Sequence, residues 1–128
     1  MTARIGMLAA GFLALSLGMA NAQTARTGNV MREKLGHAQK ILEALTTSNR
    51  DLLTSESAAL VRISNSPVWA ELRTRELAIF TEKFLKSVSE LDAAARRNDL
   101  DAAATHYNEM TMACYQCHRR LKDLRIAH

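Results

Sequence analysis

The sequence predicts an all-α protein, an antiparallel up-down-up-down four-helix bundle. Three observations favour this fold. No glycine follows Gly36 in the 128-residue chain and Pro67 is the only proline, so few residues interrupt a helix. Apolar residues recur at steps of three and four in four successive segments, which is the spacing of an amphipathic helix. The connectors between these segments are short, which favours antiparallel neighbours.

The first 22 residues have the pattern of a cleaved secretory signal peptide. Arg4 is the only charge before residue 26, an apolar run extends from Ile5 to Met19, and Ala20-Asn21-Ala22 forms an A-x-A cleavage site. An uncleaved membrane anchor is the alternative, but the run is shorter than the roughly 20 residues that a spanning helix needs. We therefore expect residues 1–22 to be removed, leaving a periplasmic domain at 23–128 with no membrane span.

The first two helices of the bundle follow this leader. One is expected to begin near Asn29 and to end at the capping cluster of residues 46–49, Thr-Thr-Ser-Asn. Its apolar stripe is Met31, Leu35, Ala38, Leu42 and Leu45. The second is expected from about Arg50 to Ile63. Its apolar side carries Leu52, Leu53, Leu60 and Ile63.

The segment Ser64-Asn65-Ser66-Pro67 separates the second helix from the third. Ser66 can cap the third helix and Pro67 suits its first position. This helix is expected to reach Arg97, where Arg96 and Arg97 complement the helix dipole. It would bury Leu77, Phe80, Phe84, Val88, Leu91 and Ala95. Asn98 and Asp99 begin the fourth helix. Its apolar positions are Leu100, Ala103, Tyr107, Met110, Cys114, Cys117 and Leu121.

Residues 114–118, Cys-Tyr-Gln-Cys-His, form the C-x-x-C-H sequence of c-type haem attachment. Two thiols three residues apart lie on one helix face, and each can add to one haem vinyl group. The adjacent His118 is then held beneath the iron as proximal ligand. Export to an oxidising compartment agrees with this interpretation. The sequence thus predicts one haem c, bound covalently by Cys114 and Cys117.

Three other interpretations of the cysteine pair are weaker. A thioredoxin-like redox pair sits at a helix N-terminus, where the dipole lowers the thiol pKa, whereas about fifteen helical residues are expected before Cys114. A zinc site needs four ligands, and Cys117, His118 and His128 would complete it only at poor spacing. A local disulfide between the two cysteines is the third.

A C-x-x-C-H near the C-terminus, at the end of the last of four helices, resembles the class II c-type cytochromes (the cytochrome c′ and c-556 family). The residues that carry the resemblance are Cys114, Cys117, His118, Leu121-Lys122 and the segment 30–35, Val-Met-Arg-Glu-Lys-Leu. The family usually has an aromatic residue and an arginine where Leu121 and Lys122 stand. The resemblance implies a haem between the helices near one end of the bundle.

The resemblance leaves two functions open, which differ on the distal side of the iron. In the c-556 type a methionine of the first helix is the sixth ligand and the protein transfers electrons. Met31 is the candidate, because it opens the first helix at the same bundle end as His118. In cytochromes c′ the distal site is open and binds NO or CO. An enzyme such as a peroxidase is less favoured, since no distal pair of histidine and arginine is placed for it.

Most of the remaining candidate residues are expected to have structural places. Met110 and Met112 share a helix with His118, so they are expected in the core and on the surface respectively. His37 and His106 are expected to be exposed or partly packed. Trp69, Phe80, Phe84 and Tyr107 are expected in the core or lining the haem pocket. Arg32, Arg119, Arg120 and Lys122 could neutralise haem propionates or form a basic face for partner docking.

Composition limits the partners. The formal charge of +4 is spread among acidic residues, which is no nucleic-acid footprint, so redox proteins are the expected partners. The family often forms homodimers through its first two helices. The outer faces of those helices carry Arg32, Lys34, Lys40, Glu43, Arg50 and Asp51. Without an apolar stripe there, a monomer or weak dimer is favoured.

The core is short of bulky side chains. Of the 106 residues after the leader, 46 are apolar and 15 of these are alanine. Such a bundle would be underpacked at native density. A haem would supply the missing bulk, so we expect the haem-free chain to be loosely folded.

Overall fold

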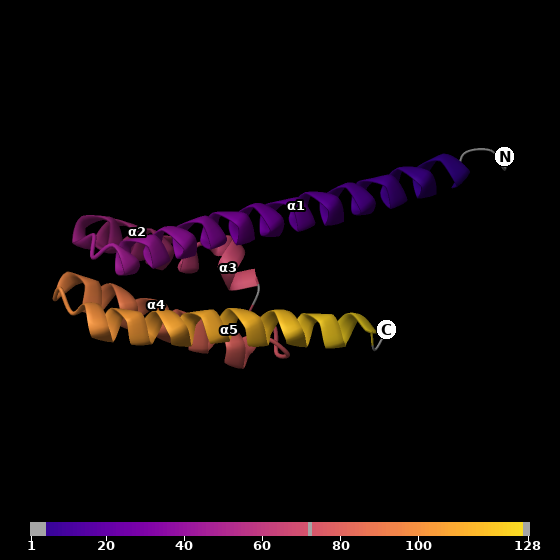
Figure 1. Cartoon of the computed structure of the whole chain (residues 1–128). Coiled ribbons are helices and arrows are strands. Elements are labelled where there is room, and N and C mark those ends of the chain that lie inside the picture. The colour runs from indigo at the N-terminus through magenta and orange to yellow at the C-terminus, as the bar shows by residue number, and fades with distance from the viewer. Residues whose placement is uncertain (1–4, 72, 127–128) are drawn as a thin grey trace.

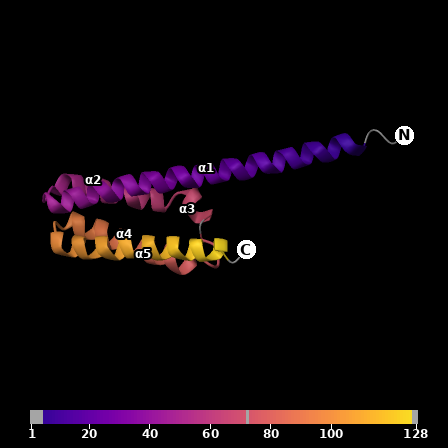
Figure 2. The same cartoon turned by 45° about the vertical axis from the view of Figure 1, so that its right-hand side comes forward.

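The four long helices of the chain form an antiparallel bundle. The computed structural model describes residues 5–71 and 73–126, with side chains for 18–71 and 73–125. Its helices are α1 (Ile5–Thr46), α2 (Arg50–Ser64), α3 (Pro67–Glu71), α4 (Ala78–Arg96) and α5 (Leu100–Ile126). Figures 1 and 2 show α1, α2, α4 and α5 running alternately in opposite directions, with the α1–α2 and α4–α5 turns at one end. The predicted up-down-up-down order is confirmed, and the short α3 is added to it.

The core lies where α2 packs against α1 and α4, and where α4 packs against α5, whereas α1 meets α5 over a shorter stretch. Ile41, Leu53, Leu60, Leu91 and Met110 are almost fully buried there. The buried alanines are Ala44, Ala59, Ala94, Ala95, Ala103 and Ala113. Small side chains let helices approach closely. The alanine-rich faces therefore let the helices pack closely in the core.

Each predicted cap is present. The Asn49 side chain accepts a hydrogen bond from the Leu52 backbone N–H at 3.1 Å, and Asp99 accepts one from Ala102 at 3.0 Å. Ser66 accepts one from the Trp69 N–H at 3.4 Å, directly before Pro67. These side chains satisfy backbone donors that have no partner within the helix. Helices α2, α3 and α5 therefore begin within a residue of their predicted starts.

Loss of the α5 cap should destabilise the bundle measurably. We expect Asp99→Ala to lower the free energy of unfolding by about 1 kcal/mol, because the Ala102 N–H loses its side-chain acceptor. Urea unfolding followed by circular dichroism measures the effect. The exposed Asn108→Ala on the same helix is the control, and an equal loss in both variants would contradict the role of the cap.

The predicted start of the first helix near Asn29 is wrong for the full chain. Helix α1 begins at Ile5 and passes through Asn29 without a break. No proline stands in this stretch, and its alanines favour helix, so nothing ends the helix between Ile5 and Asn29. In the part of the chain that the structure describes, no helix is long and apolar enough to span a membrane.

The predicted single helix from Pro67 to Arg97 is also wrong, because it is broken into α3 and α4. Helix α3 ends at Glu71, and α4 begins at Ala78. The intervening residues 73–76, Arg-Thr-Arg-Glu, are all exposed. A segment with no apolar face gains little from packing, and packing supplies most helical stability in proteins. The break turns α3, so that Trp69 packs on Phe84 with ring centroids 5.0 Å apart.

The buried stripe of α1 differs from the predicted one at alternate positions. Met31, Ala38 and Leu45 pack against the core as expected. Leu35 and Leu42, however, are 59% and 48% exposed, while Lys34 and Ile41 are buried. Both stripes have steps of three and four, so periodicity alone does not separate them. The prediction followed the spacing of Leu35 and Leu42, whereas the structure buries Lys34 against aromatic rings.

Candidate functional site

Helix α5 brings both cysteines and His118 to the place where it faces Met31 of α1. Because α5 stays helical through this motif, residues three apart share a face. The two sulfurs are therefore directed to the same side, whereas Tyr115 between them is 57% exposed. The predicted meeting of Met31 and His118 at one bundle end is confirmed.

Two cavities lie between these helices. The inner cavity, about 20 Å³ in volume, takes its lining from four helices. Its residues are Met31, Lys34, Trp69, Phe80, Thr81, Phe84, Ala113, Cys114, Cys117 and His118. The outer cleft, about 480 Å³, lies between α1 and α5. Its residues are Gln23, Thr24, Thr27, Gly28, Met31, His118, Leu121, Lys122 and Arg125. Among the residues whose side chains the structure describes, Met31 and His118 alone border both spaces.

Lys34 is the least expected residue of the inner cavity. It is 8% exposed, and its Nζ lies 3.8 Å from the ring centroid of Trp69 and 3.7 Å from that of Phe84. Aromatic ring faces attract an ammonium group. Burial lowers the pKa of Lys34 from 10.5 to about 8, although Cys114 and Cys117 act in the opposite direction. Its assignment to the outer face of the first helix is wrong.

Trp69 closes the same cavity from α3. Its side chain is 3% exposed, and its Nε1 is a buried donor with no acceptor among the residues that the structure describes. A buried polar group without a partner costs about 1–3 kcal/mol. Together with Lys34, it gives the inner cavity one cation and one N–H donor, neither of which has an anionic partner in the described part of the chain.

The two cysteines carry free thiols. Burial raises the pKa of both thiols, an effect that the nearby Lys34 ammonium opposes. Helix α5 begins at Leu100, so Cys114 lies far from the positive end of the helix dipole. A thioredoxin-like pair needs a lowered thiol pKa, and here the shift has the opposite sign.

The other predicted residues take mostly structural places. Met110 is buried and Met112 is 51% exposed, as predicted. His37 pairs with Glu56 of α2, and His106 pairs with Glu109 and Glu90. The basic side chains Arg32, Arg119, Arg120 and Lys122 are exposed. His128 and its proposed part in a zinc site lie outside the described residues.

Sequence reasoning named Trp69, Phe80 and Phe84 as residues that could line the pocket, and all three do. It missed Lys34 and Thr81. The sequence carried no signal that separates Lys34 from Leu35, because both continue a stripe from Met31 in steps of three and four. For Thr81 no signal exists, since the break that sets the start of α4 is itself unmarked.

Comparisons with known proteins support the fold. No protein-family model matches the chain, and no curated protein matches its sequence. Among solved structures, the chain is similar to that of cytochrome c′ from Rubrivivax gelatinosus, with a TM-score of 0.60 and 16% sequence identity. The match covers 73% of this chain and 88% of the other. At this identity, the comparison establishes a common four-helix-bundle fold.

Proposed function

We propose that this chain is an exported c-type cytochrome that carries electrons through one covalently attached haem. Cys114 and Cys117 would be the attachment residues, His118 the proximal iron ligand and Met31 the sixth ligand. The observation that carries the proposal is the position of Met31 and His118. They come from α1 and α5, and no other side chain in the described part of the chain borders both spaces beside the cysteines.

The lining of the two spaces suits a haem. The outer cleft, about 480 Å³, is within the roughly 300–1,000 Å³ of cofactor sites. Aromatic rings border the inner cavity and would contact an apolar ring system. Lys34 and Trp69 Nε1 lack anionic partners among the described residues, and haem propionates are anionic groups. Both the apolar and the polar residues of the site therefore fit this cofactor.

Each residue of the site would have one task. The Cys114 and Cys117 thiols would each add across a vinyl group, forming a carbon–sulfur bond to one carbon while the thiol hydrogen goes to the other. His118 and Met31 would hold the iron through nitrogen and sulfur. A bound haem supplies a one-electron Fe(III)/Fe(II) couple, whose potential depends on its axial ligands and burial. With protein ligands on both sides, exogenous ligands would be kept from the metal.

The basic side chains at the end of α5 indicate how a redox partner would dock. Arg119, Arg120 and Lys122 are exposed, and Lys122 borders the outer cleft beside His118. A partner with an acidic surface would be attracted to this edge. Electron transfer would then take place at the edge of the site where His118 is exposed.

Absorption spectra of the full-length protein, produced in a host that attaches haem c, test the assignment. We expect low-spin ferric and ferrous spectra that CO does not change. Met31→Ala should convert most of the iron to a high-spin form that binds CO, because the sulfur ligand is lost. Met112→Ala, an exposed methionine of α5, is the control and should leave the spectra unchanged.

The same spectra distinguish the second function. A wild-type protein that is already high-spin and binds CO or NO would favour the gas-binding type with an open distal site. An unchanged low-spin spectrum in Met31→Ala would instead refute Met31 as the ligand. Absence of covalent haem, measured by mass spectrometry, would overturn the proposal as a whole.

A further inference from the structure

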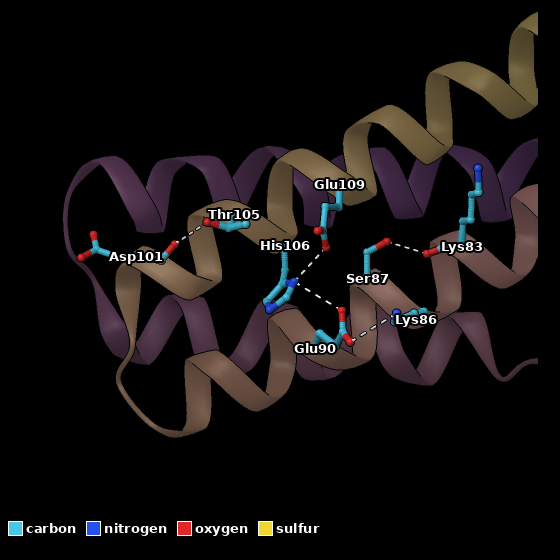
Figure 3. Close-up of polar contacts among 8 residues, drawn as sticks. All are labelled: Lys83, Lys86, Ser87, Glu90, Asp101, Thr105, His106 and Glu109. Atoms are coloured by element: carbon cyan, nitrogen blue, oxygen red, sulfur yellow. Dashed lines mark hydrogen bonds and ion pairs between the residues drawn. The ribbon is translucent and has the colours of Figure 1, made fainter.

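A second group of ligand atoms lies where α4 packs against α5, at positions of α5 that precede the cysteines. Figure 3 shows Glu90 of α4 and His106 and Glu109 of α5 pointing toward one another. Their ligand atoms all lie within 4.8 Å of one another. The imidazole Nδ1 of His106 is 3.4 Å from Glu90 Oε2 and 2.9 Å from Glu109 Oε2.

These separations are close to those of a coordination sphere. With metal–nitrogen and metal–oxygen bonds of about 2.0–2.2 Å, the corners of a tetrahedron lie about 3.3–3.6 Å apart. The separation of 3.4 Å lies within this range, and that of 2.9 Å is about 0.4 Å below it. Small rotations of three side chains that are partly exposed would bring the ligand atoms to the required spacing. The backbone of neither helix needs to move.

The two carboxylates of the cluster share one nitrogen of His106, since Nδ1 contacts both. Nδ1 carries at most one hydrogen, and it can donate this hydrogen well to only one of the two carboxylates. Lys86 lies 3.9 Å from Glu90, but its Nζ contacts the other carboxylate oxygen, Oε1. Oε2 therefore remains directed at His106. A divalent cation would satisfy all three ligand atoms together and would relieve repulsion between the carboxylates.

A groove beside the cluster supplies space for the remaining ligands of an ion. It has a volume of about 300 Å³ and is bordered by both glutamates. Lys83, Lys86, Met112 and Gln116 also border it. Structural metal sites are closed by four protein ligands, whereas sites with three keep an open position for water. The groove gives that open position access to solvent.

We propose that Glu90, His106 and Glu109 form a site for a divalent transition-metal ion of the zinc type, which joins α4 to α5. An imidazole together with two carboxylates suits Zn²⁺ and its first-row neighbours better than Mg²⁺ or Ca²⁺, which prefer oxygen ligands alone. The site is separate from the haem-attachment residues. The proposal of a metal site does not depend on the proposed cytochrome function.

Isothermal titration calorimetry of the untagged full-length chain with zinc chloride tests the site. Cys114 and Cys117 are first blocked, by attached haem or by alkylation, so that their thiols cannot bind zinc. We expect one Zn²⁺ per chain and a raised melting temperature in its presence. His106→Ala should weaken binding at least about tenfold, as should Glu90→Gln combined with Glu109→Gln.

The control is His37→Ala, which removes an imidazole that pairs with one carboxylate, Glu56, rather than with two. It should bind zinc as the wild type does. Circular dichroism shows whether each variant is folded, and the two glutamate changes serve as the test if His106→Ala is not. No binding by the wild type, or undiminished binding by the folded His106 or glutamate variants, overturns the proposal.

Discussion

A chain in which Cys114 and Cys117 are both replaced by alanine should contain no covalently bound haem. The two thiols are the groups at the site that can form carbon–sulfur bonds, and they share one face of α5. Mass spectrometry of the denatured protein should therefore give the mass of the polypeptide alone, whereas the wild type should be heavier by one haem. Acidified organic solvent should extract all haem from the variant and none from the wild type.

Loss of the haem should also lower stability strongly. A ligand that binds only the folded state stabilises it by several kcal/mol when bound tightly, and a covalent link makes the bound state permanent. The packed core around Leu91 and Met110 contains no part of the outer cleft. We therefore expect the variant to remain helical but to melt at a lower temperature and over a wider range.

Tyr115→Ala is the matched control for the cysteine variant. Tyr115 stands between the two cysteines but is 57% exposed, so its removal should leave attachment and melting unchanged. A haem-free chain that melts as sharply, and at the same temperature, as the wild type would contradict the view that the cofactor fills a gap in the core. Covalent haem in the double variant would show that other residues attach it.

Local signals in the sequence were sufficient for much of the fold. Pro67 with Ser66, and the polar pairs before Arg50 and Leu100, mark helix starts because their side chains or ring satisfy the first backbone groups of a helix. These starts need no tertiary information. The C-x-x-C-H motif is equally local, since its meaning lies in the spacing of residues on one turn. For this reason both could be predicted from the sequence alone.

Features that depend on contacts between helices could not be predicted. The break after Glu71 occurs in a segment without proline or glycine, and it directs Trp69 of α3 onto Phe84 of α4. The choice between Lys34 and Leu35 for the buried face of α1 depends on the same two rings, which come from distant parts of the chain. By residue type alone Leu35 is the better candidate for burial, but the two rings bury Lys34 instead and leave Leu35 exposed.

The expectation of a thin core was correct for only one end of the bundle. Near the α1–α2 and α4–α5 turns the alanines allow close helix packing, and residues such as Ala44 and Ala94 are fully buried. Toward the other end α1 and α5 diverge in Figure 1, and the outer cleft lies between them. Composition gives an average over the chain, so it could not show where the space would be.

Lys34→Met should stabilise the haem-free chain. Methionine has a similar length but no charge, so it can fill the space between Trp69 and Phe84 without the cost of burying an ammonium group. The lowered pKa of Lys34, about 8 against 10.5, corresponds to a cost of about 3 kcal/mol near pH 7. Attraction to two ring faces offsets about 1–2 kcal/mol of this. We expect a net gain of about 1–2 kcal/mol in urea unfolding.

The pH dependence gives a second, independent readout of the Lys34 change. Because the pKa of Lys34 is lower in the folded chain than in the unfolded chain, the unfolded chain binds more protons between pH 8 and 10.5. The free energy of unfolding of the wild type should therefore increase, relative to that of the variant, as the pH rises through this window. The advantage of Lys34→Met should be greatest below pH 8 and should shrink toward pH 10.5.

Both chains are best compared with Cys114 and Cys117 replaced by alanine, so that no haem binds and no thiol titrates in the same window. Because the two cysteines raise the pKa of Lys34, this pKa should be lower in the chain without them, and the window should then begin below pH 8. Lys83→Met provides the control, because Lys83 is exposed on the surface of α4. Its effect should stay within about 0.5 kcal/mol and should not change between pH 8 and 10.5. If the difference in free energy of unfolding between Lys34→Met and the wild type does not change with pH, then Lys34 is not buried in its charged form. The higher stability of the variant would in that case come from packing alone.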